Sequence, residues 1–82
     1  MNTNIINAIS SETRIRILSE VGKSEICACR LPSIVKKTQP AVSQHLGVLK
    51  NAGLVESRRD GTKMLYSMTE KGRRVLKDIE GW

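Results

Sequence analysis

Two cysteines stand one residue apart in the segment EICACRL, and Cys27 and Cys29 are the only cysteines of the 82-residue chain. On an ideal helix their side chains would diverge by about 200°, whereas an extended or helix-entering backbone lets both sulfurs turn to one side. Sulfurs brought together in this way can bind a soft metal ion, undergo oxidation as a pair, or fill space as small apolar groups. The spacing alone leaves these three interpretations open.

The surroundings of the pair favour reactive thiols. Arg30 follows directly, and LPSIVKK predicts a helix with Pro32 in its first turn. A cation and a helix N-terminus both favour thiolate over thiol. Zinc's usual four-ligand structural site, however, cannot be completed from Cys27 and Cys29 alone.

The composition favours a polyanionic partner. Fourteen Lys and Arg residues against eight acidic ones give a net charge of +6, which attracts nucleic acid through phosphate contacts and counterion release. One Tyr, one Trp and no Phe provide few surfaces on which single-stranded bases could stack. Double-stranded DNA is therefore the expected partner.

The length predicts a single domain over residues 1–82, which would be only marginally stable by itself. A second subunit is therefore expected. No apolar run approaches the roughly 20 residues that cross a bilayer, and the N-terminus lacks the pattern of a signal peptide. We expect a cytoplasmic protein with no membrane partner.

Helical periodicity dominates the first two thirds of the chain. NIINAI carries isoleucines at helical spacing, and Ser10 or Ser11 can cap a second helix, ETRIRILSEV. In that helix Ile15, Leu18 and Val21 share one side, and Arg14 and Arg16 are expected to point outward. After the short third helix, PAVSQHLGVLKNAG predicts a fourth that ends at Gly53.

The pattern then changes to that of strands. LVESRR and TKMLYSM predict two strands joined across Asp60 and Gly61, in a type I′ turn. TEKGRRVLKDIEGW predicts a last helix. This order predicts a mainly α fold with a β-hairpin, a winged helix-turn-helix of about five helices with a two-stranded wing.

The fourth helix has the features of a DNA-reading helix. With Val42 at zero and about 100° per residue, Leu46 lies within about 40° of it, whereas Gln44, Gly47 and Asn51 lie opposite. Gly47 lets the backbone approach the groove, and the two amides can pair with adenine edges. A solvated amphipathic helix followed by a solvated charged turn is the alternative. The residues expected to contact DNA are Lys37, Thr38, Gln39, Pro40, Ser43, Gln44, His45, Gly47, Lys50, Asn51, Arg58, Arg59 and Lys63.

SETRIRIL, EICACRL and TQPAVSQHLGVLKNAGLVESRRDGTKMLYSM together resemble the ArsR/SmtB family of metal-responsive winged-helix repressors. The resemblance covers almost the whole chain and is strongest in SQHLGVLKNAGLV. It implies a homodimer formed by the first and last helices, residues 1–10 and 69–82. The interface residues it implies are Ile5, Ile6, Ile9, Val75, Leu76, Ile79 and Trp82.

The resemblance also implies a sensor site. In the arsenic, cadmium and lead branch the third helix begins with a stretch similar to E(L/I)CxCxL, and Cys27 and Cys29 match its cysteines. As(III), Cd(II), Pb(II) and Zn(II) are thus the candidate effectors. The zinc branch of the family instead uses carboxylates and histidines on the last helix, and TEKGRRVLKDIEGW has no histidine. Where arsenic sensors of this branch often carry a third cysteine, this chain has Pro32, so As(III) would keep an exogenous thiol or hydroxide.

The expected function is a sequence-specific DNA-binding repressor that a soft metal or metalloid at Cys27 and Cys29 releases from its operator. Two alternatives are kept: a redox-responsive or effector-independent DNA-binding regulator, and an RNA- or protein-binding winged helix. No enzyme is expected, because the chain has no HExxH, no Gly-rich phosphate loop and no nucleophile with an evident base.

Overall fold

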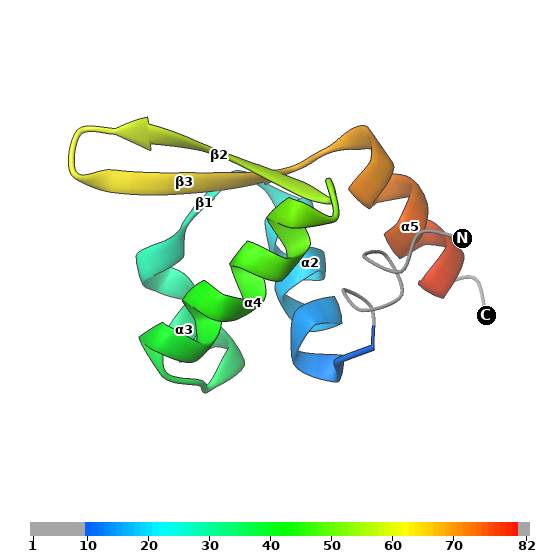
Figure 1. Cartoon of the computed structure of the whole chain (residues 1–82), viewed down its shortest axis with the longest axis horizontal. Helices are drawn as coiled ribbons and strands as arrows, with labels where there is room; N and C mark the ends of the chain where they lie inside the picture. Colours follow the sequence, from blue (N-terminus) through cyan, green and yellow to red (C-terminus); the bar gives the residue numbers. More distant parts are fainter. Residues whose placement is uncertain (1–9, 81–82) are drawn as a thin grey trace.

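The computed structural model describes residues 10–80, which form a winged helix-turn-helix (Figure 1). The expectation of a mainly α fold with a hairpin is confirmed, and the first expected helix lies outside the described residues. Figure 1 shows the wing tip and the last helix at opposite ends of the molecule. In chain order the elements are α2 (Glu12–Lys23), β1 (Ile26–Cys27), a 3-10 turn η1 (Ala28–Arg30), α3 (Leu31–Val35), α4 (Gln39–Asn51), β2 (Val55–Asp60), β3 (Lys63–Met68) and α5 (Glu70–Glu80).

Local side-chain chemistry sets the ends of α2 and α4. The hydroxyl of Ser11 accepts from the backbone N–H of Arg14 at 3.3 Å, and that of Thr38 caps α4 in the same way. At the other end of α4, Gly53 has φ +79° and its N–H donates to the carbonyl of Lys50 at 2.9 Å. The N–H of Leu54 then reaches back into the helix, which completes a Schellman motif.

A hydrophobic core lies between the helices and the sheet. The helix α2 contributes Ile17, Leu18 and Val21, so its buried side is turned from the expected one and Ile15 is only half-buried. Arg14, expected to point outward, is also half-buried. The remaining core residues are Leu31, Val35, Val42, Leu46, Leu49, Ala52, Leu54, Val55 and Leu76.

The sheet of the wing has three strands, not the two expected. β1 pairs antiparallel with β3, with Ile26 opposite Tyr66 and Cys27 opposite Leu65, and the strand order is β1-β3-β2. A strand of two residues is too short to show an alternating pattern, so the sequence gives no periodic signal for it. The cysteine segment is therefore part of the wing sheet.

The hairpin turn lies one residue further on than expected. Asp60 pairs with Lys63, which leaves Gly61 and Thr62 at the centre of the turn. Gly61 has φ +63°, and among described non-glycine residues only Lys36 has a positive φ. Glycine first with a negative-φ residue second is the φ pattern of a type II′ turn, so the expected type I′ turn centred on Asp60 and Gly61 is wrong.

The helix α5 is anchored to the junction between α4 and β2. The Thr69 hydroxyl donates to the Gly53 carbonyl at 2.6 Å and accepts from the Gly72 N–H at 3.0 Å. Gly72 is buried so closely that an added Cβ would clash with the carbonyl oxygen of Leu54. The absence of a side chain at Gly72 thus allows the helix to pack directly on backbone.

Candidate nucleic-acid interface

The outer face of α4 is polar and open to solvent, as expected for a reading helix. Val42, Leu46 and Leu49 are buried, whereas Ser43, Gln44 and Gly47 between them are exposed. An added Cβ at Gly47 would meet no atom within 4 Å, so nothing in the described chain covers the centre of this face. Its exposed residues are Ser43, Gln44, Gly47, Lys50 and Asn51.

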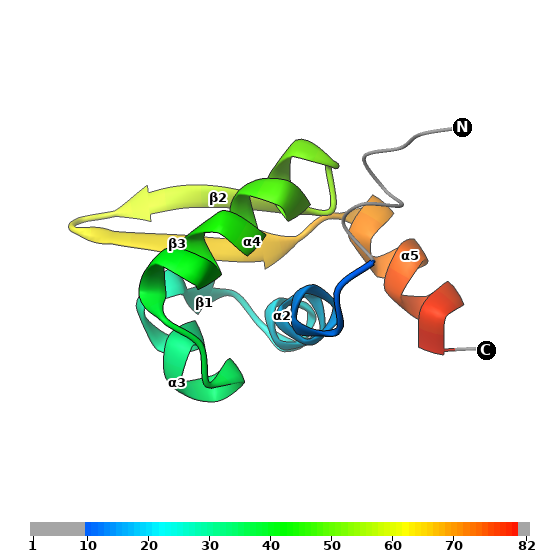
Figure 2. The ribbon, with the colours of Figure 1, turned by 60° about the horizontal axis from the view of Figure 1, so that its bottom comes forward.

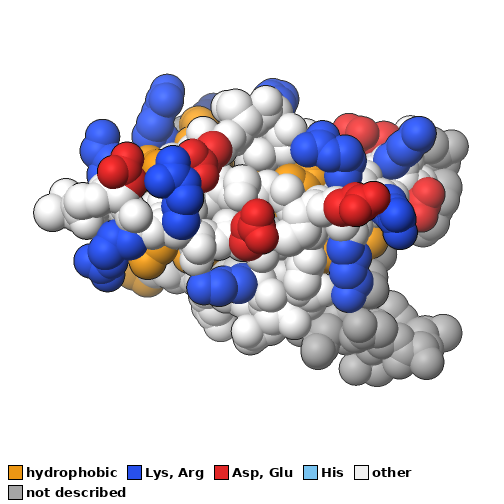
Figure 3. Space-filling view, turned by 90° about the horizontal axis from the view of Figure 1, so that it is seen from above, with side chains coloured by type: hydrophobic (Ala, Val, Ile, Leu, Met, Phe, Trp, Pro, Cys, Tyr) orange, Lys and Arg blue, Asp and Glu red, His pale blue; other side chains and the backbone are white. Residues whose placement is uncertain are grey.

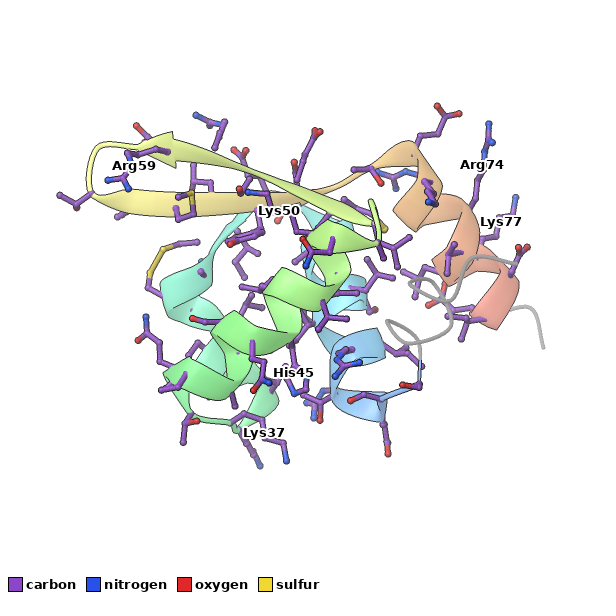
Figure 4. The ribbon with its side chains drawn as sticks, viewed as in Figure 1. Lys37, His45, Lys50, Arg59, Arg74 and Lys77 are labelled. Carbon is purple, nitrogen blue, oxygen red and sulfur yellow. A yellow bond between two sulfur atoms is a disulfide. The ribbon has the colours of Figure 1, made fainter. Side chains whose placement is uncertain are left out.

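The turn before α4 presents the helix's first residues and two lysines. Lys36 ends α3 in the left-handed region at φ 58°, and the Lys37 N–H donates to the Pro32 carbonyl at 3.1 Å. The side chains of Lys36 and Lys37 are both exposed, as are those of Thr38, Gln39 and Pro40. Figure 4 shows Lys37 beside the N-terminal end of α4, with His45 further along the helix.

His45 lies where α4 meets α2 and is half-buried, unlike the other residues expected to contact DNA. Its Nδ1 accepts a hydrogen bond from Nε of Arg14 at 2.9 Å. Partial burial and the positive charges of Arg14 and Lys37 all lower the pKa of the imidazole. These effects favour the neutral form of His45.

The two faces of β2 have different surroundings. Ser57 faces α4, because its hydroxyl accepts from the Lys50 ammonium at 2.8 Å. Side chains alternate along a strand, so Arg59 belongs to the same face as Ser57. Arg59 and Lys63 are both exposed near the tip. Figure 2 shows the wing projecting beyond α4, and Figure 1 shows that the C-terminal end of α4, which carries Lys50, is the end that lies by the hairpin.

Arg58 belongs to the opposite face of β2 and is bound by an acidic partner. Its Nε and Nη2 donate to the two carboxylate oxygens of Glu25, both at 2.8 Å. This bidentate pair lowers the pKa of Glu25 and raises that of Arg58. Figure 3, seen from the sheet side, shows acidic and basic side chains intermixed over the wing. Arg58 and Arg59 thus lie on opposite faces of β2, although both were expected to contact DNA.

The sulfurs of Cys27 and Cys29 lie on one side and are joined in a disulfide, with the two Cα atoms 5.2 Å apart. Cys27 is extended in β1, and Cys29 lies in the 3-10 turn that leads into α3. The segment therefore has the strand-to-helix geometry expected for sulfurs that converge. Among described residues, no group of three or more His, Cys, Asp or Glu side chains could hold a metal ion.

The expected interface residues have different positions on α5. Leu76 is only 8% exposed and belongs to the core of the protomer itself, and Val75 packs against that core. Ile79 is half-buried. Their role in a dimer stays a prediction, and Ile5, Ile6, Ile9 and Trp82 lie outside the described residues. No helix within residues 10–80 is long and apolar enough to cross a membrane.

Residues 11–57 match a protein family described as bacterial regulatory proteins, arsR family. This segment runs from the cap of α2 into β2 and contains the cysteine pair and the whole reading helix. The chain belongs to the arsR family. Its members are regulatory proteins, which agrees with the expectation that this arsR-family chain is not an enzyme.

Two curated relatives support the assignment of this arsR-family chain. It is 32% identical over 78 residues to an uncharacterised HTH-type transcriptional regulator of Methanocaldococcus jannaschii, covering 93% of this chain and 88% of that protein. It is 35% identical over 66 residues to the HTH-type transcriptional repressor SmtB of Mycobacterium tuberculosis, covering 80% of this chain. Only 49% of that repressor is matched, so the chain spans about half its length.

A solved structure agrees with the fold of this arsR-family chain. The homodimeric winged helix-turn-helix DNA-binding domain Mb0332 of Mycobacterium bovis superposes with a TM-score of 0.87 at 25% identity, covering 95% of this chain and 73% of that one.

Three side chains form hydrogen bonds with residues expected to contact DNA, and these bonds were not predicted from the sequence. Glu25 and Arg14 bind residues 33 and 31 positions away, and Ser57 binds a residue seven positions away across a helix end. No local spacing connects such partners, so no sequence signal could have identified them.

Proposed function

We propose that the protein is a homodimeric, sequence-specific DNA-binding repressor. The observation that carries this proposal is the exposed polar face of α4. A hydrogen bond from Lys50 to Ser57 joins this helix to the face of β2 that carries Ser57 and Arg59. The chain also has a net charge of +6. Gln44 and Asn51 have the amides that recognise adenine edges, and Arg59 and Lys63 have charges suited to phosphates. A DNA-binding regulator of this kind works in the cytoplasm.

A dimer would bring two reading helices to one operator. Two reading helices enter successive major grooves when they lie one helical turn of DNA apart, about 34 Å. Each protomer has one proposed reading helix, α4. The relative Mb0332 is homodimeric, and many repressors use such symmetry to bind palindromic operators.

The test is a selection of bound duplexes from a random pool, followed by fluorescence anisotropy on the selected sequence. Gln44→Ala should reduce sequence preference by about 1–3 kcal/mol at particular base pairs. Arg59→Ala should weaken binding to every duplex and flatten its salt dependence. If no sequence is enriched, or if both variants behave alike, the reading-helix assignment is wrong.

We further propose that Cys27 and Cys29 receive the signal that releases DNA. The geometry of the pair supports this, because the Cys27 backbone pairs with Leu65 of the wing and the Cys29 turn leads directly into α3. A soft ion such as As(III), Cd(II) or Pb(II) would bind both thiolates of the reduced pair. With only two protein sulfurs, As(III) would need a third ligand from outside, and Zn(II) would need two.

The disulfide favours a second candidate signal, which is oxidation. In that case two thiols lose two protons and two electrons to a peroxide, which is reduced to water, and the sulfurs form the bond seen here. Titrating the reduced, DNA-bound protein separately with arsenite, Cd(II), Pb(II) and hydrogen peroxide distinguishes the candidates. Release must be lost in the Cys27→Ser variant. DNA binding that none of these reagents changes would mean that the pair only fills space.

A further inference from the structure

The Arg14–His45 contact connects the first turn of α2 to the reading helix and has no role in the function proposed so far. Arg14 Nε donates to His45 Nδ1 at 2.9 Å, and both side chains are half-buried. A guanidinium keeps its protons in proteins, so it can only donate. Nδ1 must therefore have a free lone pair, and the single ring proton of a neutral His45 must be on Nε2.

The position of His45 gives this Nε2–H a direction. The two ring nitrogens point away from each other, and Nδ1 is directed at α2. Nε2–H is thus directed away from Arg14 and α2. Gln44, the residue before His45 on α4, is exposed. Figure 4 shows Lys37 at the N-terminal end of α4 and His45 further along the same helix. A donor beside a lysine at the margin of a reading helix suits a phosphate oxygen.

We propose that Arg14 is a positioning residue for DNA binding, which fixes His45 in the neutral Nε2–H form so that this N–H donates to a backbone phosphate beside Lys37. The inference rests on the proposed DNA-binding function and adds a mechanism to it. Arg14 acts through His45 and need not touch DNA. His45 binds phosphate as a neutral donor in a fixed direction and not as a cation.

The charged groups around the ring support the neutral form. Arg14 faces it from α2 and Lys37 from the turn between α3 and α4, and both lower the pKa of His45. Protonation would also place a proton on Nδ1 and break the hydrogen bond to Arg14. His45 is the only histidine of the chain, so its ionisation can be followed without ambiguity.

Two substitutions at His45 separate its two nitrogens. In His45→Asn the side-chain amide takes the place of Nδ1, so an acceptor for Arg14 is kept and the outer donor is lost. In His45→Gln the amide takes the place of Nε2, so the outer donor is kept and the acceptor is lost. We expect binding to a short mixed-sequence duplex at pH 7.5 to weaken about tenfold in His45→Asn and less than about threefold in His45→Gln. Equal losses would overturn the proposal.

Substitution of Arg14 tests the positioning role. Arg14→Met keeps the apolar stem and removes the donor, whereas Arg16→Met removes the same charge from an exposed position of the same helix. In free Arg14→Met protein the NMR titration of His45 should move to higher pH. Its DNA affinity should then rise severalfold between pH 7.5 and 5.5, because the released ring becomes a cation. Wild type and Arg16→Met should show much smaller changes.

The tautomer can be read directly from long-range ¹H–¹⁵N correlations of the imidazole, which should show a protonated Nε2 and an unprotonated Nδ1. A mixed tautomer in the wild type, or an Arg14→Met variant that titrates like the wild type, would overturn the inference. Thermal unfolding of each variant separates loss of fold from loss of contact. If Lys37→Ala and Arg59→Ala weaken binding but the His45 variants do not, only this inference fails. If the wild type binds no duplex, the proposed function fails.

Discussion

Gly47 and Gly72 are both helical, but they have opposite surroundings. Gly47 is exposed on α4 and has open space where a Cβ would be, whereas Gly72 is buried in α5 against the carbonyl of Leu54. Neither has a positive φ, so conformational freedom explains neither glycine. The reason for Gly72 is packing, and the proposed reason for Gly47 is the close approach of DNA.

Gly47→Ala should stabilise the protein and weaken its binding to DNA. Alanine is favoured over glycine inside a helix by about 0.5–1 kcal/mol, and the added methyl meets no atom of the described chain. The same methyl would stand between the helix backbone and the groove. Urea unfolding and anisotropy on one preparation measure both effects. A variant that is more stable and binds DNA as tightly as the wild type would show that DNA does not approach Gly47.

Gly72→Ala should have the opposite effect on stability. The added Cβ would lie too close to the Leu54 backbone and to Cγ of Met68, so α5 must shift. We expect a loss of about 1–3 kcal/mol in the free energy of unfolding, as for other overpacked sites. Urea unfolding measures it, and Gly47→Ala is the matched control because it makes the same change in an open helical site. Unchanged stability would contradict the tight packing of α5.

The sequence predicted the positions of the helices better than the strand order of the sheet. Ser11 and Gly53 act within a few residues of themselves, so the start of α2 and the end of α4 could be predicted. The cap of α4 by Thr38 was not predicted, because the helix was expected to begin at Pro40. The exposed side of α4 followed from periodicity in the same way. The strand β1 is two residues long and pairs with β3, almost forty residues later. Its place in the wing therefore depends on tertiary contacts that no local pattern encodes.

The same limit explains the partly mistaken view of the wing. Asp60 and Gly61 correctly marked a hairpin, but pairing across the strands placed the turn on Gly61 and Thr62. Arg58 and Arg59 are the same residue type and adjacent in the sequence, but only Arg58 has an acidic partner in the structure. The reason is that Glu25 lies within reach of only one face of β2. Which arginine is available to DNA is thus decided by a residue outside the hairpin.

Glu25→Gln should release Arg58 from its ion pair and strengthen non-specific binding to DNA. The pair is exposed to solvent, so the stability of the fold should hardly change. One more available cation should steepen the dependence of log K on log salt by up to about 0.9. Anisotropy with a mixed-sequence duplex over a salt series measures this slope.

Glu56→Gln is the control for that experiment, because it removes one negative charge from the same face of β2 without touching the Glu25–Arg58 pair. Both variants raise the net charge by one. Equal increases in affinity would show that net charge alone is responsible. A larger increase in Glu25→Gln would show that Arg58 itself binds phosphate once it is released.

The molecule as a whole has its proposed DNA surface and its expected dimer surface at different places. The reading helix and wing lie toward one end, and α5 lies at the other. On α5 the half-buried Val75 and Ile79 are one turn apart, among exposed charged residues. The core of one described protomer is small for a stable domain. Association through α5 would therefore stabilise the fold and also fix the spacing of two reading helices.

Ile79→Glu should weaken self-association, and DNA affinity should fall with it, because two half-sites are no longer bound together. A carboxylate buried at a subunit interface without a partner is costly, and the midpoint of thermal unfolding should fall and become less dependent on protein concentration. Sedimentation equilibrium and anisotropy at matched concentrations measure both effects. Lys77→Gln is the control, since it also lowers the net charge by one, at an exposed position of the same helix. If Ile79→Glu remains as fully dimeric as Lys77→Gln, the interface does not include Ile79. The pairing through α5 that the family resemblance implies would then be wrong for this chain.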